Sequence, residues 1–444
     1  MKKNNKIYII GGGPAGISVA YYLSKKNIKF QLFEASSELG GNCKTFKVDN
    51  FYFDSGAHRF HDKDEKSSKI VKLIMGNELK LINAPSQIFV QDKIVDFPLS
   101  PLSLIKFFGF TTLLIEFFRL ILIKIKHSGT ISNFKDFAVH TYGRKISSTF
   151  LLNYSEKLWG LPPEKLSVEI SGKRLKGLDI KSLFFELVGL QGKKNKHLDG
   201  SFYYPQNGIG SIFKKLSHLA GIENFKVNNN ITKIYHENDK ITSIKINDSE
   251  KINVDFLVSS IPLDKLILGL YPKPPENIIN SVKLIDYRDL ILVIFLLNKE
   301  SVNNNGSMYF PSKEYAFTRI FEPKNRSKLM SPPNRTSLVV EVPISRNKMI
   351  FEENKLIKEV RNQLIDLGFF KKQEITKIEL KKIFNAYPIL DSGYYENLKP
   401  IKKYLKKFKN LILNGRNGKY EYNHIHDHIK DGRCISSIID EYMV

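Results

Sequence analysis

The chain has 444 residues, and its 69 Lys and Arg residues against 45 Asp and Glu residues give a formal net charge of +24. Its 42% hydrophobic and 12% aromatic content is typical of a globular protein that buries a large core, here long enough for two lobes. Because the lysines are spread along the chain rather than clustered, the charge does not predict nucleic-acid binding. It favours a basic cleft for an anionic small molecule instead.

The first predicted elements are a strand, a glycine turn, a helix and a second strand over residues 6–34. Gly11, Gly13 and Gly16 follow the apolar run in G-x-G-x-x-G spacing, which is typical of a dinucleotide-binding turn. Such glycines allow the sharp turn, the close approach of a pyrophosphate to the backbone, and the contact of helix with strand. Glu34 ends the second strand, where a carboxylate accepts hydrogen bonds from the adenosine ribose. The phosphates are expected at the positive end of the helix.

The residues after Glu34 favour a flavin over a nicotinamide. A second Gly-Gly turn, ASSELGGNCKTF, is followed by FYFDSGAHRFH. This order resembles flavoproteins with two dinucleotide motifs, in which the second turn wraps the FAD diphosphate and the G-x-H segment lies beside the isoalloxazine. We therefore expect FAD as the cofactor.

The next stretch, residues 69–205, is predicted to be mostly helical, with a strand pair at 86–99. Within it, residues 101–126 are very apolar, but Lys106, Glu116 and Arg119 interrupt them before the roughly 20 residues that a spanning helix needs. The favoured interpretation is one or two buried helices. The alternative is an interfacial helix that rests the protein on a membrane.

The second half of the chain is predicted to contain two further segments of the dinucleotide-binding fold, separated by a strand-rich lobe. Residues 208–262 predict a short helix, two strands joined at Asn238 and Asp239, and a strand that ends at VSSIP. A strand-rich lobe follows over 263–395, with DLILVIFLL, EYAFTRIF and TSLVVEVP as strands. Residues 400–444 predict a helix, the strand NLILNG and a last helix whose amino terminus, near 423–425, points its dipole at the flavin pyrimidine.

These segments predict an α/β fold in which a discontinuous FAD-binding Rossmann-like domain carries an inserted mixed α+β substrate domain. The FAD-binding domain is expected to comprise residues 1–68, 206–262 and 400–444. The substrate domain is expected to comprise 69–205 and 263–399.

Several motifs resemble the flavoprotein superfamily that includes amine oxidases, protoporphyrinogen oxidase and UDP-galactopyranose mutase. GGGPAG, Glu34 and VSSIP are shared across the superfamily. The motifs closer to the mutase branch, in its order, are GGN at 40–42, GAHRFH at 56–61, YSEKLWG at 154–160, KR at 173–174, TRIFEPK at 318–324, EVP at 341–343, AYPI at 386–389 and GRNGKYEY at 415–422. By contrast, KRLKGL at 173–178 and FYYPQNGIGSIFKKL at 202–216 look more like oxidoreductases of the protoporphyrinogen oxidase type.

The resemblance implies a set of site residues. His58 falls beside the flavin N5 edge, and the catalytic group is completed by Arg319, Arg416 and Tyr422. The expected cofactor-binding residues are Gly11, Gly13, Pro14, Ala15, Gly16, Glu34, Gly41, Asn42, Ala57, His58, Ile231, Gly415, Arg416, Asn423 and Ile425. The expected substrate-binding residues are Tyr154, Trp159, Arg174 and Tyr420. Guanidinium and phenol groups suit a diphosphate, and flat rings suit a base.

The leading functional interpretation is an FAD-dependent oxidoreductase that acts on a sugar or lipid-linked intermediate of surface polysaccharide synthesis. The alternative is a redox-neutral mutase of the UDP-galactopyranose mutase type, in which N5 of reduced FAD is the nucleophile. A membrane-associated flavin-binding scaffold is a third interpretation.

Two single cysteines, Cys43 and Cys434, and the spacing of His424, His426 and His428 predict neither a disulfide scaffold nor a metal site. We expect a cytoplasmic protein, with peripheral contact to the inner face of the membrane as the alternative.

Overall fold

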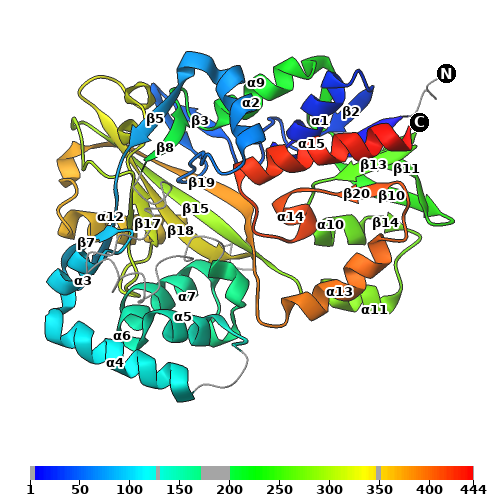
Figure 1. The fold of residues 1–444 in the computed structure, drawn as a ribbon. Coiled ribbons are helices and arrows are strands. Elements are labelled where there is room, and N and C mark those ends of the chain that lie inside the picture. The colour runs from blue at the N-terminus through cyan, green and yellow to red at the C-terminus, as the bar shows by residue number, and fades with distance from the viewer. Residues whose placement is uncertain (1–5, 127–130, 172–200, 347–351, 444) are drawn as a thin grey trace.

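A five-stranded parallel sheet lies at one end of the computed structural model, which describes residues 6–126, 131–171, 201–346 and 352–443 (Figure 1). Its strand order is β20 (Leu411–Leu413), β13 (Phe256–Ser259), β1 (Ile7–Ile10), β2 (Phe30–Phe33) and β9 (Phe225–Lys226). All four neighbouring pairs are parallel. Strands from three distant parts of the sequence therefore meet in one sheet, in segments that the predicted FAD-binding domain also contains.

Helices cover this sheet, which explains why every residue of β1 is apolar and buried. The helix α1 (Pro14–Lys25) runs beside the C-terminal helix α15 (Ile425–Tyr442) in Figure 1. Gly432 makes this contact possible, because a Cβ there would lie 2.6 Å from the backbone carbon of Ser18. The helices α2 (Glu65–Met75) and α9 (Gly210–Leu219) flank α1.

A second sheet has the order β12 (Glu250–Asn253), β11 (Lys240–Ile246), β10 (Ile231–Glu237) and β14 (Leu270–Tyr271). The single strand predicted before VSSIP is two strands, β12 and β13. The chain leaves the second sheet at Val254 and Asp255, where the Asp255 carboxylate accepts a hydrogen bond from the Lys6 N–H at 2.7 Å. The short helices beside this sheet are α10 (Leu263–Leu268), α11 (Glu276–Val282), α13 (Tyr394–Leu405) and α14 (Gly415–Lys419).

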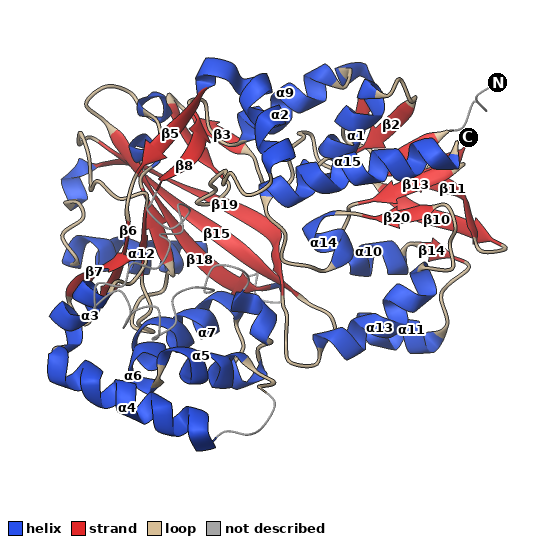
Figure 2. Cartoon of the chain, in the orientation of Figure 1, coloured by secondary structure: helices blue, strands red, loops and turns tan. Residues whose placement is uncertain are grey.

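The second lobe is built on a seven-stranded sheet (Figure 2). Its order is β19 (Ile375–Pro388), β15 (Tyr287–Leu297), β18 (Thr336–Ser345), β17 (Arg319–Phe321), β16 (Ser307–Tyr309), β6 (Ser86–Val90) and β7 (Lys93–Phe97). Of the predicted strand EYAFTRIF, only β17 forms. The preceding backbone turns away, and the carbonyls of Phe317, Phe310 and Ser312 accept hydrogen bonds from the Lys157 ammonium.

Two antiparallel strand pairs and a group of helices complete this lobe. The pairs are β3 (Thr45–Val48) with β4 (Phe51–Asp54), and β5 (Leu79–Asn83) with β8 (Ser201–Pro205). The helices are α3 (Pro101–Phe108), α4 (Phe110–Lys126), α5 (Phe134–Tyr142), α6 (Arg144–Ile146), a π-helical segment at 147–152, α7 (Asn153–Trp159) and α12 (Glu353–Asp366).

The apolar stretch 101–126 forms two helices, α3 and α4, separated at Gly109, whose φ is +83°. The favoured prediction that these helices are buried holds for Leu104 and Leu120, but it is wrong for the outer face of α4, where Phe118 and Ile125 are exposed. In the described part of the chain, only one side of α4 has protein to pack against, because the helix lies at the edge of the lobe (Figure 1). Among the described helices, none has the length and apolarity needed to cross a bilayer.

Candidate active site

One cavity of about 990 Å³ joins the two lobes. This volume is at the upper end of the range usual for ligand pockets, roughly 300–1,000 Å³. The predicted site residues that line it are Gly11, Gly13, Pro14, Ala15, Glu34, Gly41, Asn42, Ala57, His58, Tyr154, Trp159, Ile231, Arg319, Gly415, Arg416, Tyr422, Asn423 and Ile425. The fold thus brings together residues that are up to about four hundred positions apart in the sequence.

The β1–α1 turn forms one wall of the cavity. Gly11 has φ +99°, a conformation that side chains rarely adopt. Gly16 does not line the cavity, but a Cβ at this position would lie 2.0 Å from the Gly11 carbonyl oxygen. The turn is held from the far side by the Ser260 hydroxyl, which donates to the carbonyls of Ile10 and Gly11. These contacts place the amino terminus of α1 at the cavity.

Glu34 lies where β2 ends and fixes the same turn from the other side. One of its carboxylate oxygens accepts a hydrogen bond from the Gly12 N–H at 2.6 Å, and the other accepts from the Ser36 N–H at 2.9 Å. The carboxylate is thereby held against the cavity wall in one orientation. A carboxylate at the end of the second strand is the group that binds ribose hydroxyls in dinucleotide folds.

Gly13 supplies a test of whether a cofactor fits this wall. Its backbone, with φ −80° and ψ −177°, suits any residue, and a Cβ there would meet only the Gly41 Cα at an ordinary 3.7 Å. Nothing in the described protein therefore requires a glycine at this position. Close approach of a phosphate to the helix amino terminus does require one. At Gly41, by contrast, a Cβ would lie 2.9 Å from the Gly13 Cα, so the two turns are packed backbone to backbone.

A buried carboxylate, Glu341 of β18, organises the centre of the site. It accepts two hydrogen bonds from the Arg319 guanidinium, at 2.7 and 2.8 Å, and one from the Ala57 N–H at 2.8 Å. Burial disfavours the charge on Arg319, but the Glu341 carboxylate outweighs it and raises the pKa of Arg319. The pair leaves Nη1 of Arg319 without a protein acceptor among the described residues, and the guanidinium lines the cavity.

His58 is the next residue after Ala57, whose N–H donates to Glu341. His58 is partly buried and lines the cavity. Burial first, and then the charges of Arg416 and Arg319, lower the pKa of His58 to about 3. The imidazole is therefore neutral at physiological pH. Its Nε2 is buried and has no hydrogen-bond partner in the described part of the chain. Arg326 holds the segment in place by donating to the His58 carbonyl at 3.1 Å.

An aromatic wall faces His58 across the cavity. Trp159 makes edge contacts with Tyr387 and Tyr422, with ring centroids 5.8 and 5.7 Å apart. The Arg416 guanidinium lies over the ring of Tyr422 at 4.9 Å and donates hydrogen bonds to the carbonyls of Asn423 and Ala386. Arg416 thus ties the start of α15 to β19 while keeping its positive charge at the cavity.

Three further polar atoms at the cavity are buried and have no partner in the described ranges. They are Oδ1 of Asn385, Oδ1 of Asn417 and Nδ1 of His428. Burial and the nearby charge of Arg416 lower the pKa of His428 to about 3, so it too is neutral. Buried polar atoms in proteins are nearly always hydrogen-bonded. Together with Gly13, these atoms indicate that the cavity is complete only with a bound polar molecule.

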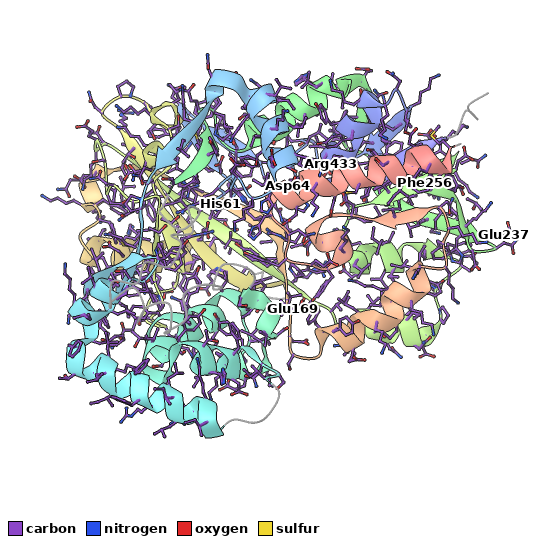
Figure 3. All side chains as sticks on the ribbon, in the orientation of Figure 1. His61, Asp64, Glu169, Glu237, Phe256 and Arg433 are labelled. Atoms are coloured by element: carbon purple, nitrogen blue, oxygen red, sulfur yellow. The ribbon has the colours of Figure 1, made fainter. Side chains whose placement is uncertain are left out.

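The loop that leads into α2 forms the rim of the cavity. Figure 3 labels His61 and Asp64 on this loop, and both line the cavity. The Asp64 carboxylate caps α2 by accepting from the Ser67 N–H at 2.9 Å, and Arg433 of α15 lies 3.8 Å from it.

Two predicted substrate residues are not at the cavity or cannot be placed. Tyr420 lies outside the cavity lining, which corrects its prediction as a substrate residue. Its φ of +57° turns the phenol away, and the hydroxyl bonds to the backbone of Asp286 and the Ile389 carbonyl. Arg174 lies outside the described residues.

Several residues of the site were not predicted: Glu341, which holds Arg319 but does not itself line the cavity, and the lining residues Tyr387, Asn385, Asn417 and His428. Glu341 stood in the quoted EVP motif without a role, and Tyr387 stood in AYPI. Asn385 and Asn417 carried no signal, because an isolated asparagine is usually a turn residue. His428 was judged only as a metal ligand.

The parallel sheet, the glycine turn after β1, the Glu34 carboxylate and a cavity between two lobes together are typical of a dinucleotide-binding enzyme. Residues 14–374 match the family of flavin-containing amine oxidoreductases, so the chain belongs to that family. It is similar to protoporphyrinogen oxidase of Dictyostelium discoideum, with 24% identity over 70% of each chain. It is also similar to dTDP-fucopyranose mutase of Escherichia coli, with 24% identity over 49% of this chain and 55% of the relative.

The fold also matches a crystal structure of reduced UDP-galactopyranose mutase, with a TM-score of 0.86, 20% identity and coverage of 99% of this chain and 94% of that one. These findings confirm the predicted superfamily, the fold class and FAD as the cofactor. When bound, FAD would supply the redox chemistry of its ring. The role of each lining residue remains a prediction.

Proposed function

We propose that this flavoenzyme binds a nucleoside-diphosphate sugar beside FAD and rearranges it without net electron transfer. The observation that supports this proposal is the combination of two guanidinium groups, Arg319 and Arg416, with an aromatic wall in one cavity. A diphosphate needs positively charged donors in fixed geometry, and a nucleobase or sugar ring needs flat surfaces to contact.

The charge balance of the cavity agrees with an anionic substrate. The carboxylates that line it already accept protein hydrogen bonds: Glu34 from Gly12, Asp64 from Ser67, and Asp427 from the His424 N–H. Glu341 is matched by Arg319. Positive charge is in excess because the described residues that line the cavity include six lysines and arginines, which are Arg59, Lys63, Lys265, Arg319, Arg416 and Lys430, against the three carboxylates.

The neutral state of His58 fits a reaction without proton abstraction by a strong base at that position. Its enclosed Nε2 can donate or accept one hydrogen bond beside the cofactor, and its orientation is set by the Arg326 contact to its own carbonyl. Arg319 holds charge at the substrate, and Glu341 fixes both groups relative to one another.

A second candidate is two-electron oxidation of an anionic, partly apolar substrate. It is favoured by the protoporphyrinogen oxidase relative and by an apolar end of the cavity. That end is formed by Phe97, Leu99, Phe134, Phe150 and Leu151.

The proposal is tested by titrating the holoenzyme with UDP, dTDP, UDP-galactopyranose and dTDP-fucopyranose while the flavin absorption spectrum is recorded. We expect at least one nucleotide to perturb the spectrum at micromolar concentration, with conversion of its sugar only by dithionite-reduced enzyme under argon. Arg319→Lys removes the free Nη1 donor and is expected to raise the nucleotide Kd about tenfold.

The matched control is Arg335→Lys, which alters an exposed arginine that does not line the cavity. It should leave the nucleotide Kd unchanged. Absence of any spectral change with all four compounds at millimolar concentration, in enzyme that retains its FAD, would exclude the nucleotide-sugar proposal and leave the oxidase candidate.

A further inference from the structure

The helix α4 presents an apolar face to solvent. Phe118 is 58% exposed, Leu122 55% and Ile125 74%, although α4 is a regular helix of 17 residues. We call the α4 face the set of exposed side chains Phe110, Leu114, Phe118, Ile121, Leu122 and Ile125. At about 100° per residue, these positions fall within one arc of about 120° on the helix surface. This contiguous arrangement differs from the scattered single apolar residues that are normal on a protein surface.

The opposite side of α4 explains why the helix keeps this orientation. Leu120 is buried against the lobe, and Glu116, only 5% exposed, is enclosed beneath the helix. Its carboxylate accepts hydrogen bonds from the Arg119 guanidinium at 2.9 Å and from the Lys145 N–H at 3.1 Å. The one acidic side chain of residues 101–126 is therefore turned inward and neutralised.

Basic side chains border the α4 face. Residues 101–126 contain four lysines and arginines against the single glutamate. Lys106 of α3 and Arg119 of α4 are exposed. The α4 face thus has the pattern of an interfacial amphipathic helix, in which apolar residues enter the acyl boundary and flanking cations remain among lipid headgroups.

We propose that the α4 face binds the surface of an anionic lipid bilayer. The basic border matches the negative surface of such a bilayer, to which lysines and arginines are attracted. A second copy of this chain is a poorer partner, because it carries the same border and a net charge of +24. This contact goes beyond the proposed reaction and is independent of it.

The place of α4 in the chain relates it to the cavity. The rings of Phe107 and Phe108 at the end of α3 contact Phe150, with centroids 5.4 and 5.8 Å apart. Phe150 in turn lines the apolar end of the cavity. The helix next to α4 in the chain therefore packs on a residue of that apolar end.

The test is sedimentation of the FAD-loaded protein with vesicles of phosphatidylcholine alone or mixed with phosphatidylglycerol. We expect binding to the mixed vesicles that is weaker, but not lost, at high salt, because salt screens only the charged part. The variant Phe118→Gln, Leu122→Gln, Ile125→Gln keeps good helix formers and is expected to lower the partition coefficient by on the order of tenfold or more.

The matched control changes Leu73, Leu219 and Ile438 to Gln, since these apolar residues are also exposed on helices but lie outside the α4 face. It should bind vesicles like the parent protein. Equal binding by parent and α4 variant, with intact flavin spectra, would overturn the proposal. So would absence of binding to mixed vesicles, or a parent dimer that the α4 variant converts to a monomer.

Discussion

The Glu341 carboxylate connects two parts of the site through its two oxygens. It fixes the cavity arginine Arg319 and the backbone just before His58, and its side chain is only 1% exposed. If the Glu341 carboxylate is removed, the charge of the buried Arg319 guanidinium has no counter-charge. This costs far more free energy of unfolding than breaking a surface ion pair. Glu341 is therefore a positioning residue for both groups.

Replacing Glu341 with Gln keeps the shape of the side chain and removes its charge. We expect the free energy of unfolding of the FAD-saturated protein to fall by about 3 kcal/mol, because Arg319 stays buried without its counter-charge. Urea unfolding followed by far-UV circular dichroism measures this change.

The control for Glu341 is Glu379→Gln, which breaks the partly exposed pair with Lys377 at 2.9 Å. It should cost less than about 1 kcal/mol. Equal losses in the two variants would show that the Glu341 pair has no special weight in this fold.

The two enclosed histidines make a prediction about pH. His428 has a pKa of about 3 in the fold, so between pH 6.5 and 3 the unfolded chain binds a proton that the folded chain does not. Stability must then decrease as the pH falls through this window, by about 1.4 kcal/mol per pH unit for each such histidine. His58 has the same sign, with its pKa also at about 3.

The measurement compares the slope of unfolding free energy against pH, from 6 to 5, in the parent protein and in His428→Asn. The variant should lose about 1.4 kcal/mol per pH unit of slope. His218→Asn, at an exposed position on α9, controls for the loss of an imidazole. An unchanged slope in His428→Asn would mean that His428 is protonated alike in both states.

Among single residues, the sequence could predict those whose role follows from their spacing along a short stretch of the chain. The glycines of the turn and Glu34 were found in this way, because a strand, a turn and a helix are contiguous. Glu341 and Asn385 were not, since they come from β18 and β19, far along the chain, where Glu341 holds the lining residue Arg319 and Asn385 itself lines the cavity. Tyr420 was misplaced because only the positive φ of its backbone decides on which side its phenol lies.

At the scale of elements, the β1–α1 turn carries the clearest sign of a ligand. Gly13 in this turn has an ordinary backbone conformation, and a Cβ there would make only an ordinary contact with the Gly41 Cα, at 3.7 Å. Its glycine is explained by close approach of a phosphate to the amino terminus of α1.

Replacing Gly13 with Ala should therefore separate cofactor binding from folding. We expect the Kd for FAD, measured by quenching of flavin fluorescence, to rise at least about tenfold, because the Cβ occupies the space above the helix terminus. The melting temperature at saturating FAD should stay close to that of the parent protein.

Gly393→Ala is the matched control. Gly393 has φ −102°, and a Cβ there would lie 3.5 Å from the Asp391 carboxylate, in ordinary contact. It should not alter the Kd for FAD. An unchanged Kd in Gly13→Ala would remove the ligand-based reason for glycine in this turn.

Two elements show where the hydropathy of a segment is insufficient to predict its burial or its secondary structure. A strongly apolar run predicts burial when the surrounding fold is unknown, but burial of α4 depends on whether another element covers it. Its inner side packs on the lobe and its outer side does not. Similarly, EYAFTRIF has strand-like composition, yet its Phe317 carbonyl accepts a hydrogen bond from the Lys157 ammonium, and only residues 319–321 form a strand.

At the scale of the whole molecule, positive charge and apolar surface are placed for two different partners. The cavity between the lobes presents Arg319 and Arg416 beside the aromatic wall and the cofactor turn. The α4 face lies on the outer surface of the helices of the second lobe. The order of segments along the chain made the two-lobed fold predictable, whereas the chemistry of the reaction depends on side chains that only the assembled sheets bring together.

The most direct test of the proposed function counts products for each reduced flavin. Enzyme-bound FAD is photoreduced under argon, excess reductant is removed, and an excess of the sugar nucleotide that perturbs the flavin spectrum is added. A redox-neutral rearrangement predicts many product molecules per FAD, with the flavin still reduced at the end. At most one product per reduced FAD, or turnover only by oxidised enzyme with consumption of an electron acceptor, would contradict it.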